Sequence, residues 1–367
     1  MKVICQRAAL LDAISVAGLV VPTRSPKPVL QCLMLTAKDD KLTIDATDLE
    51  LAVKFVDAAV QVESEGATLV PADRLRDIVR ESTDDTIALS VEGNEMHLRG
   101  ADSHYKIFTQ NASEFPPVPG SDNEPHLEIA AGTLKQMISQ TLFATSKEGT
   151  RYAFNGVLFV IENKSLALVA TDGRRLALSR GDVISAKNPS KAKPIVPARS
   201  LGLVEKLLDD PEATVSISLS DNQAVFSVPD ARLTTNLLEG QFPQYEEVIP
   251  KDADKRMVAN TADFLSAVRR SSLLTSDNTK GVRMDFSKAR GVVLSSRDPE
   301  AGEAKIEFSC KFDGADLSIG FNPSFLVEAL KIINADEVSF DLTNPGRPGL
   351  IKAGSSFLYV IMPVNLQ

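Results

Sequence analysis

The sequence predicts an α+β protein made of three tandem copies of one domain, each with two helices on antiparallel sheets. Two repeated features indicate the copies. Asp48, Asp172 and Asp298 each follow a short strand-like run, at steps of 124 and 126 residues. Pro71, Pro197 and Pro323 each open a helical pattern, at two steps of 126 residues. A fixed period of this kind indicates repeated units.

Two helical segments are expected in each copy. The first helices are predicted at 7–20, 131–144 and 261–274, where apolar residues recur at helical spacing. The second helices start at the three prolines, because a proline in the first helical turn needs no hydrogen-bond donor. The sequence thus predicts six helices.

Short runs rich in β-branched residues predict the strands, about eight in each copy. The clearest runs are 86–91, 95–99, 157–161, 214–219, 224–228, 282–286, 305–308, 337–342 and 357–362. Polar, proline-bearing linkers lie at 120–125 and 251–255, so we predict domains at 1–122, 126–250 and 254–367.

The segment VATDGRRLAL at 169–178 joins a strand to a turn and then to a second strand. Asp172 and Gly173 form a turn dipeptide, since aspartate can bond its own backbone and glycine accepts a positive φ. Arg174 and Arg175 follow directly. The alternative to a functional site is an ordinary hairpin with solvated arginines.

Composition excludes several classes of protein. The chain has no tryptophan and 5% aromatic residues, which speaks against a single-strand binder that stacks bases. No run of about 18 apolar residues exists, so no membrane span is expected. Three widely spaced cysteines and the absence of a signal-like N-terminus predict a reduced, cytoplasmic protein.

Charge is unevenly distributed. The six helical segments hold 10 basic and 7 acidic residues, so the remainder carries −12 of a chain whose net charge is −9. One interpretation is a set of helices that face phosphate and make weak, sequence-independent contact. The other is a chance division, because the difference is small.

No catalytic pattern is present. The sequence has no Walker A loop, GxGxxG, GxSxG or HExxH, and its three histidines are scattered. We therefore predict no catalytic residues, no metal ligands and no cofactor. Two other functions stay open: a protein-interaction scaffold of three repeats that never touches nucleic acid, and an enzyme on an unfamiliar repeat.

Four segments in order, NGVLF at 155–159, VATDGRRLAL at 169–178, LLEGQFPQYEEVIP at 237–250 and the tail at 359–364, carry a resemblance. Together with the three copies, they resemble the bacterial β sliding clamp family, the processivity subunit of DNA polymerase III. The resemblance implies a non-catalytic, ring-forming homodimer that pairs head to tail. Its helices would face double-stranded DNA, and a pocket would bind short peptides of the replicative polymerase, the clamp loader and repair proteins.

The resemblance also implies three sets of site residues in this sequence. The partner-peptide pocket would comprise Phe154, Thr171, Gly173, Arg174, Arg175, Leu176, Pro243, Val248, Asn322, Phe325, Val360, Met362, Pro363, Val364 and Leu366. The DNA-facing residues would be Arg24, Arg151, Tyr152 and Arg199, to which the charge on the predicted helices, and not the resemblance, adds Lys135, Lys206 and Arg269. The dimer interface would be Tyr105, Ile107, Leu273 and Leu274.

Some of these residues have a plainer interpretation, and some positions depart from the family pattern. Each of the four dimer residues could instead belong to an internal core, and Met362 with Pro363 could be a frayed C-terminal strand. Glu246 and Glu247 stand where clamps often carry arginine, Asn365 where a basic residue is familiar, and Phe325 where tyrosine is common. These departures bear on peptide preference, not on the existence of the pocket.

Overall fold

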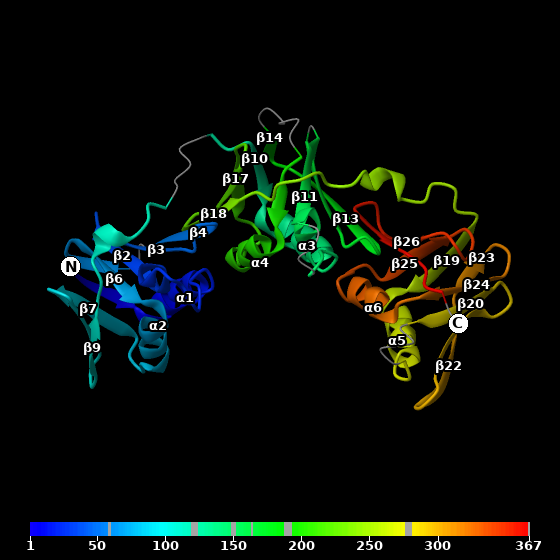
Figure 1. The fold of residues 1–367 in the computed structure, drawn as a ribbon, viewed down its shortest axis with the longest axis horizontal. Helices are drawn as coiled ribbons and strands as arrows, with labels where there is room; N and C mark the ends of the chain where they lie inside the picture. The colour runs from blue at the N-terminus through cyan, green and yellow to red at the C-terminus, as the bar shows by residue number, and fades with distance from the viewer. Residues whose placement is uncertain are drawn as a thin grey trace. The chain divides into compact units, whose positions relative to one another are not determined.

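The computed structural model describes residues 1–57, 60–118, 124–147, 152–162, 164–186, 193–275 and 281–365, with only the backbone of Asp57 and Tyr152. These residues form two compact units (Figure 1). The first unit contains Met1–Gly132, Arg199–Leu237 and strand β14 (Ser185–Ala186). The second contains Thr133–Val183, strand β15 (Ile195–Pro197) and the chain from Leu238 onward.

The first unit holds two antiparallel sheets. One is a five-stranded sheet in the order β5-β1-β7-β8-β9, and the other is nine-stranded in the order β14-β10-β16-β17-β18-β4-β3-β2-β6. The remaining strands are β1 (Lys2–Gln6), β2 (Cys32–Lys38), β3 (Lys41–Thr47), β4 (Leu51–Asp57), β5 (Val60–Ser64), β6 (Gly66–Pro71), β7 (Thr86–Glu92), β8 (Glu95–Arg99), β9 (His104–Phe108), β10 (Leu127–Ala130), β16 (Thr214–Leu219), β17 (Gln223–Ser227) and β18 (Ala231–Asn236).

The second unit also holds two antiparallel sheets. A nine-stranded sheet runs in the order β15-β11-β12-β13-β27-β26-β25-β19-β23, and a four-stranded sheet in the order β22-β21-β20-β24. The strands are β11 (Gly156–Glu162), β12 (Ser165–Thr171), β13 (Arg175–Asp182), β19 (Lys255–Asn260), β20 (Val282–Ser287), β21 (Gly291–Asp298), β22 (Gly302–Phe308), β23 (Lys311–Asp313), β24 (Leu317–Phe321), β25 (Glu337–Leu342), β26 (Gly349–Ala353) and β27 (Phe357–Ile361).

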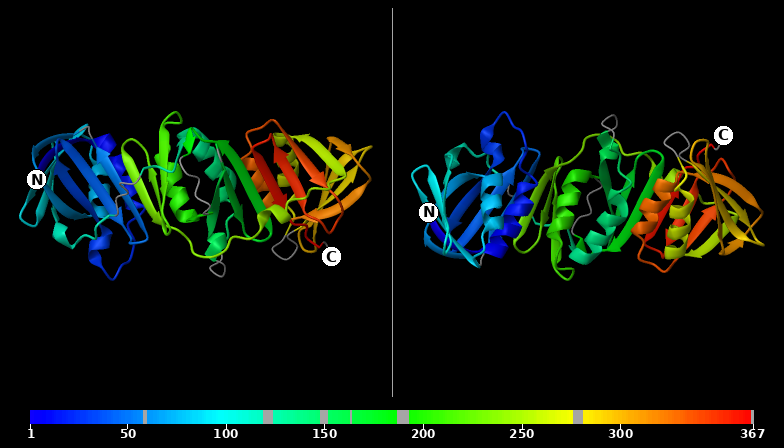
Figure 2. Two further views of the ribbon diagram at one scale, coloured as in Figure 1. Left: turned by 90° about the horizontal axis from the view of Figure 1, so that it is seen from above. Right: turned by 90° about the horizontal axis from the view of Figure 1, so that it is seen from below.

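Six α-helices lie among the described residues: α1 (Arg7–Gly18), α2 (Ala72–Glu81), α3 (Ala131–Leu142), α4 (Ala198–Leu207), α5 (Thr261–Ser271) and α6 (Pro323–Lys331). Within each unit the helices gather on one side of the sheets (Figure 2). Helix α1 packs on α2, and α5 packs on α6. Leu10 and Ile14 of α1 are fully buried, as the apolar spacing predicts.

The α+β prediction is confirmed, with two corrections. Each copy has nine strands among the described residues, not about eight. Pro71 and Pro197 are the last residues of β6 and β15 and directly precede their helices, whereas Pro323 alone begins a helix. A proline at the end of a strand removes no hydrogen bond from the sheet when its nitrogen faces away from the partner strand. The proline can therefore end the strand, and the helix begins one residue after it. The predicted domain limits stay predictions.

The three repeated aspartates form the same local turn. Asp48, Asp172 and Asp298 each accept hydrogen bonds through Oδ1 from the backbone N–H groups two and three residues later, at 2.8–3.0 Å. Gly173 has φ +87°, and the equivalent Leu49 has φ +80°. The repeat therefore extends to the hydrogen-bonding pattern of single side chains.

The copies are joined through equivalent strands. β4, β13 and β22 hold the same place in their copies, as do β9, β18 and β27. In the first unit β4 pairs with β18, and in the second β13 pairs with β27. Among the described residues β22 and β9 remain at the edges of their sheets, without the pairing that their equivalents make.

No helix among the described residues is long and apolar enough to cross a membrane.

Candidate functional site

The turn that follows β12 positions the central residues of the candidate site. Thr171 Oγ1 donates to the carbonyl oxygen of Arg175 at 2.6 Å and accepts from the N–H of Gly173 at 3.1 Å. Asp172 Oδ1 accepts hydrogen bonds from the backbone N–H groups of Arg174 and Arg175. These bonds fix the backbone so that Arg174 points to solvent while Arg175 turns inward.

Arg175 lies at the centre of a buried charge network. Its side chain is 7% exposed. Nε donates to Asp172 Oδ2 at 3.0 Å, Nη2 donates to the carbonyl oxygen of Phe143 at 2.8 Å, and Nη1 pairs with Glu328 of α6. The guanidinium carbon lies 4.3 Å from the ring centroid of Phe325. The prediction of a solvated hairpin arginine is therefore wrong for Arg175.

Burial and the neighbouring groups shift the pKa of Arg175 in opposite directions. Burial by itself would lower the pKa of Arg175, but the neighbouring Tyr359, Glu328 and Asp172 raise it above its ordinary value. Burial raises the pKa of Tyr359, whose hydroxyl donates to the carbonyl oxygen of Phe325 at 3.0 Å. Arg175 is therefore a permanent cation that connects the turn to α6 and β27.

A cavity of about 230 Å³ opens above this network. We call it the Arg175 pocket, and it is lined by Thr145, Ser146, Lys147, Asp172, Arg174, Arg175 and Phe325. The tail lies beside it, because the N–H of Met362 donates to the carbonyl oxygen of Arg174 at 2.9 Å. The N–H of Val364 donates to Gly320 at 2.9 Å, so the tail is fixed and not frayed there.

A second cavity, of about 240 Å³, lies on the same unit. We call it the Pro243 pocket, and it is lined by Leu158, Lys193, Gly240, Gln241, Phe242, Pro243, Gln244, Tyr245 and Glu246. Burial, followed by the hydrogen bond with Glu246, raises the pKa of Tyr245 to about 12. Tyr245 therefore stays neutral and can line an apolar groove.

An apolar core lies next to the Pro243 pocket. Leu176 and Val360 face each other across β13 and β27, and both belong to a buried cluster that includes Leu158 and Tyr245 of the Pro243 pocket. They are 3% and 2% exposed, so these two predicted pocket residues belong to the core and line neither pocket. Met362, one residue beyond β27, is 43% exposed and presents a flexible apolar side chain.

Several predicted pocket residues have other positions. Val248 is 48% exposed and lines neither pocket. Asn322 caps α6, where its Oδ1 accepts from the N–H of Ser324 at 3.0 Å. Thr171 is buried and holds the turn. Phe154 is half-buried, and its carbonyl oxygen accepts from the N–H of Ser146 at 2.8 Å. Leu366 lies outside the described residues.

The predicted DNA-facing residues are spread over both units. Arg24, Lys206 and Arg269 are exposed, and Lys135 is half-buried. Arg199 is exposed at the start of α4 but pairs with Asp48, the repeated turn aspartate of the first copy. This ion pair reduces the positive charge that Arg199 presents. Arg151 and the side chain of Tyr152 lie outside the described part of the chain.

The predicted dimer residues divide in two groups. Tyr105 of β9 is 42% exposed and Leu273, which follows α5, is 78% exposed. Leu274 is half-buried. Ile107 is 7% exposed, which favours the internal-core alternative for that residue. Its neighbour Phe108 is 71% exposed and was missed by the sequence prediction.

Sequence reasoning also missed the partners of Arg175. Phe143 directly follows α3, whereas Glu328 and Tyr359 come from α6 and β27, far apart in the chain. Glu328 and Tyr359 lie in segments already assigned to a helix and a strand, but no local pattern showed that they meet an arginine. Lys147 and Tyr245 were likewise missed, although Tyr245 stands inside a segment that had been singled out.

Comparison with known proteins supports one family over the whole chain. The N-terminal, central and C-terminal domains of the DNA polymerase III beta subunit match residues 1–119, 128–244 and 246–365. The beta sliding clamp of Pseudomonas aeruginosa is 30% identical over 98% of this chain and 99% of its own length. The beta sliding clamp of Escherichia coli K12 is 31% identical over the full length of both chains.

Solved structures agree with the sequence comparisons. The DNA polymerase sliding clamp of Bacillus subtilis matches with a TM-score of 0.94 at 26% identity, over all of both chains. A sliding clamp (DNA polymerase III subunit beta) of Pseudomonas aeruginosa bound to griselimycin also matches with a TM-score of 0.94, at 30% identity over all of both chains. This chain therefore belongs to the DNA polymerase III beta subunit family, the beta sliding clamps.

Proposed function

We propose that this protein is a DNA sliding clamp, a non-catalytic processivity factor that encircles duplex DNA and tethers a replicative polymerase and other proteins. The observation that carries the proposal is the family match over the whole chain, including the matching fold. A scaffold that never touches nucleic acid is the weaker alternative, because no feature of the fold favours it over a clamp.

The strand pairing supports a homodimeric ring. β18 pairs with β4 and β27 pairs with β13, so each copy joins its neighbour by the same two strands. β9 and β22 are the remaining members of these two sets. Head-to-tail pairing of β9 of one chain with β22 of another completes the series and closes a ring of two chains. Tyr105, Phe108, Leu273 and Leu274 would pack along this seam.

The helices would face the DNA. Arg24, Lys206 and Arg269 are exposed and would contact phosphates, with Lys135, Arg151, Tyr152 and Arg199 as further candidates. Few cations around a duplex give contact that is weak, salt-sensitive and independent of sequence. A closed ring does not need tight contact, because closure itself keeps the protein on DNA.

The Arg175 and Pro243 pockets would bind partner peptides. Arg174, Phe325 and Met362 offer a cation, an aromatic face and a flexible apolar side chain, which suit short extended segments of variable sequence. Such segments would come from the polymerase, the clamp loader and repair proteins. Because bacterial DNA is replicated in the cytoplasm, we also propose that this protein acts there.

The test is topological. Protein assembled on nicked circular DNA by a clamp loader should co-elute with that DNA and be lost when the circle is cut once, because an open end lets a ring slide off. Equal retention on linear and circular DNA would contradict the clamp. A combined Arg24→Ala and Arg269→Ala variant should bind linear duplex DNA more weakly but keep both its retention on the closed circle and its peptide binding.

A second experiment addresses the pocket. Met362→Ala, or a chain ending at residue 361, should lose binding of a polymerase-derived peptide in fluorescence anisotropy while its thermal unfolding is unchanged. Unchanged affinity would show that the peptide binds elsewhere, and the clamp itself would still stand on the circular-DNA result.

A further inference from the structure

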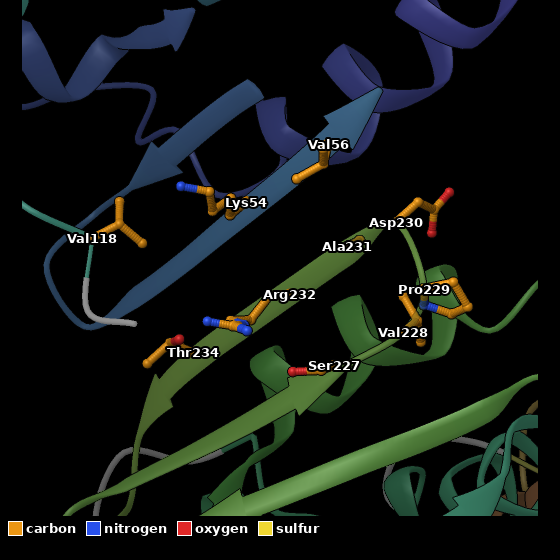
Figure 3. Close-up of a pocket in the computed structure, with 10 residues that line it drawn as sticks. All are labelled: Lys54, Val56, Val118, Ser227, Val228, Pro229, Asp230, Ala231, Arg232 and Thr234. Carbon is orange, nitrogen blue, oxygen red and sulfur yellow. The ribbon is translucent and has the colours of Figure 1, made fainter. Parts of the chain in front are cut away.

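A small pocket lies on the nine-stranded sheet of the first unit, where β4 of the first copy pairs with β18 of the second (Figure 3). Its volume is about 240 Å³. Val56, Val118, Val228 and Pro229 contribute apolar walls, and Lys54 and Arg232 contribute two cations. We call it the Lys54 pocket. It belongs to the first unit, whereas the Arg175 and Pro243 pockets belong to the second.

The Lys54 pocket opens on the side of the sheet away from helix α1. Phe55 lines a neighbouring cavity together with Ala9, Ala13 and Val16 of α1, and this cavity shares Val56, Asp230 and Ala231 with the Lys54 pocket. Because side chains alternate along a strand, Lys54 lies on the opposite face. Helix α1 therefore does not cover it.

Two like charges face each other in this pocket. Lys54 and Arg232 are directly opposite in the register of β4 and β18. Like charges at opposed positions of neighbouring strands destabilise a sheet unless an anion neutralises them. Among the described residues the guanidinium of Arg232 makes no hydrogen bond or ion pair, although the residue is half-buried. The arrangement leaves an unneutralised cation beside apolar walls.

Among the described residues, a single carboxylate reaches either cation. Asp45 of β3 is opposite Lys54 on its other side, and its Oδ1 lies 3.8 Å from the Lys54 Nζ. Asp45 is 8% exposed and Oδ1 accepts no hydrogen bond within the described structure. Asp230 also lines the pocket, but its carboxylate points away from the nitrogens of Lys54 and Arg232 (Figure 3). Within the part of the chain that the structure describes, no carboxylate therefore satisfies Arg232.

We propose that the Lys54 pocket binds an acidic residue in an extended peptide segment of a partner protein, with an apolar neighbour of that residue against Val56, Val118 and Pro229. A guanidinium and an ammonium side by side suit a carboxylate. The apolar walls and the small volume suit one or two side chains and leave no room for a nucleotide. The partner would thus be held at a place other than the two pockets of the second unit.

Asp45 competes with the ligand carboxylate for Lys54. Burial raises the pKa of Asp45 to about 6, and the charge of Lys54 lowers it by less. The charged group that faces Asp45 is Lys54 of β4. On the other side of Asp45, β2 places the uncharged Met34 opposite it. Arg232 and Asp230 lie on the far side of Lys54 from Asp45. Below about pH 6 Asp45 takes up a proton and releases Lys54, so the affinity for the acidic peptide should rise.

The experiment uses the full chain and fluorescence anisotropy. The probe is a fluorescein-labelled pentapeptide with one aspartate between two leucines, and its comparison is the same peptide with asparagine. The aspartate peptide should bind at least tenfold more tightly. Arg232→Gln should weaken binding about tenfold, whereas Lys41→Gln, which removes an exposed cation elsewhere on the sheet, should not. Asp45→Asn should strengthen binding several-fold at pH 7.5 and abolish its pH dependence.

Three results would overturn the proposal. Equal affinity for the two peptides would show that no carboxylate is recognised. Wild-type affinity of Arg232→Gln, with the variant folded by circular dichroism, would place the peptide elsewhere. Displacement of the peptide by inorganic phosphate at concentrations below the Kd of the peptide would identify a site for free oxyanions. None of these results depends on retention on circular DNA, so the clamp function is tested separately.

Discussion

At the scale of single residues, Arg175 and Arg174 show how neighbouring, chemically identical side chains take different roles. Arg175 is buried among Asp172, Glu328 and the Phe143 carbonyl, whereas Arg174 is exposed. Arg175 thus holds the pocket together, and in the proposed function Arg174 would offer its charge to a partner peptide. Burial, and not residue type, makes the difference, because a guanidinium taken out of water needs fixed partners.

Replacing Arg175 by alanine should destabilise the protein. Breaking a buried ion pair costs about 3–5 kcal/mol, and here we expect about 2–3 kcal/mol because Glu328 is 45% exposed. Arg174→Ala is the matched control and should change stability by less than about 0.5 kcal/mol. Thermal unfolding of both variants is the measurement. Equal melting temperatures would contradict the assigned network.

The equivalent turn positions 49 and 173 should respond oppositely to substitution. Both have a left-handed backbone, which favours glycine, yet the first copy has Leu49 there. Gly173→Ala should destabilise by about 1 kcal/mol, and Leu49→Gly should stabilise by about 0.5 kcal/mol, since Leu49 is 51% exposed and loses little burial. Chemical unfolding would measure both. A loss of stability in Leu49→Gly would show that its side chain matters more than its backbone.

Asp45 should make stability depend on pH. Burial raises its pKa in the folded chain to about 6 from the ordinary value of 3.8, so the folded state holds its proton more tightly than the unfolded state. Stability from this group is therefore present below about pH 4 and is lost as pH rises to 6. Asp45→Asn should raise stability by about 2–3 kcal/mol at pH 7.5 and by little at pH 4. The same increment at both pH values would contradict a buried, titrating carboxylate.

At the scale of elements, the proposed dimer seam joins the strand edges β9 and β22. Phe108 on β9 and Leu273 beside α5 are 71% and 78% exposed, more than isolated surface residues of this size usually are. β9 carries Lys106, and β22 carries Glu303, Lys305 and Glu307, each of which is already paired within the chain. The exposed apolar side chains, and not the charges, therefore mark the proposed seam.

Substituting Phe108→Asp together with Leu273→Asp should separate the two chains. Both side chains are exposed within one chain, so folding should be unaffected while the apolar part of the seam is lost. Analytical ultracentrifugation should show a mass of 39.6 kDa in place of twice that value. An unchanged dimer would mean that the seam lies elsewhere. Ile107→Asp, at a buried position, should instead unfold the first copy.

At the scale of the whole molecule, ring closure is the property on which the proposed function depends. Small-angle scattering of the pure protein should give twice 39.6 kDa with a hollow, flattened profile, because two chains are needed to pair every β9 with a β22. An elongated monomer at micromolar concentration would mean that the seam is weak. Retention on circular DNA would then require another partner to close the ring.

The sequence by itself determined the α+β class, the three copies and the turn at Asp172, because these follow from local periodicity and from side chains that bond their own backbone. It also carried the resemblance to the clamps. Only the tertiary structure decided that Arg175 is buried, that Ile107 is core while Phe108 is exposed, and that Arg199 pairs with Asp48. Those outcomes depend on which distant strands and helices meet, and partners more than 100 residues apart leave no trace in local spacing.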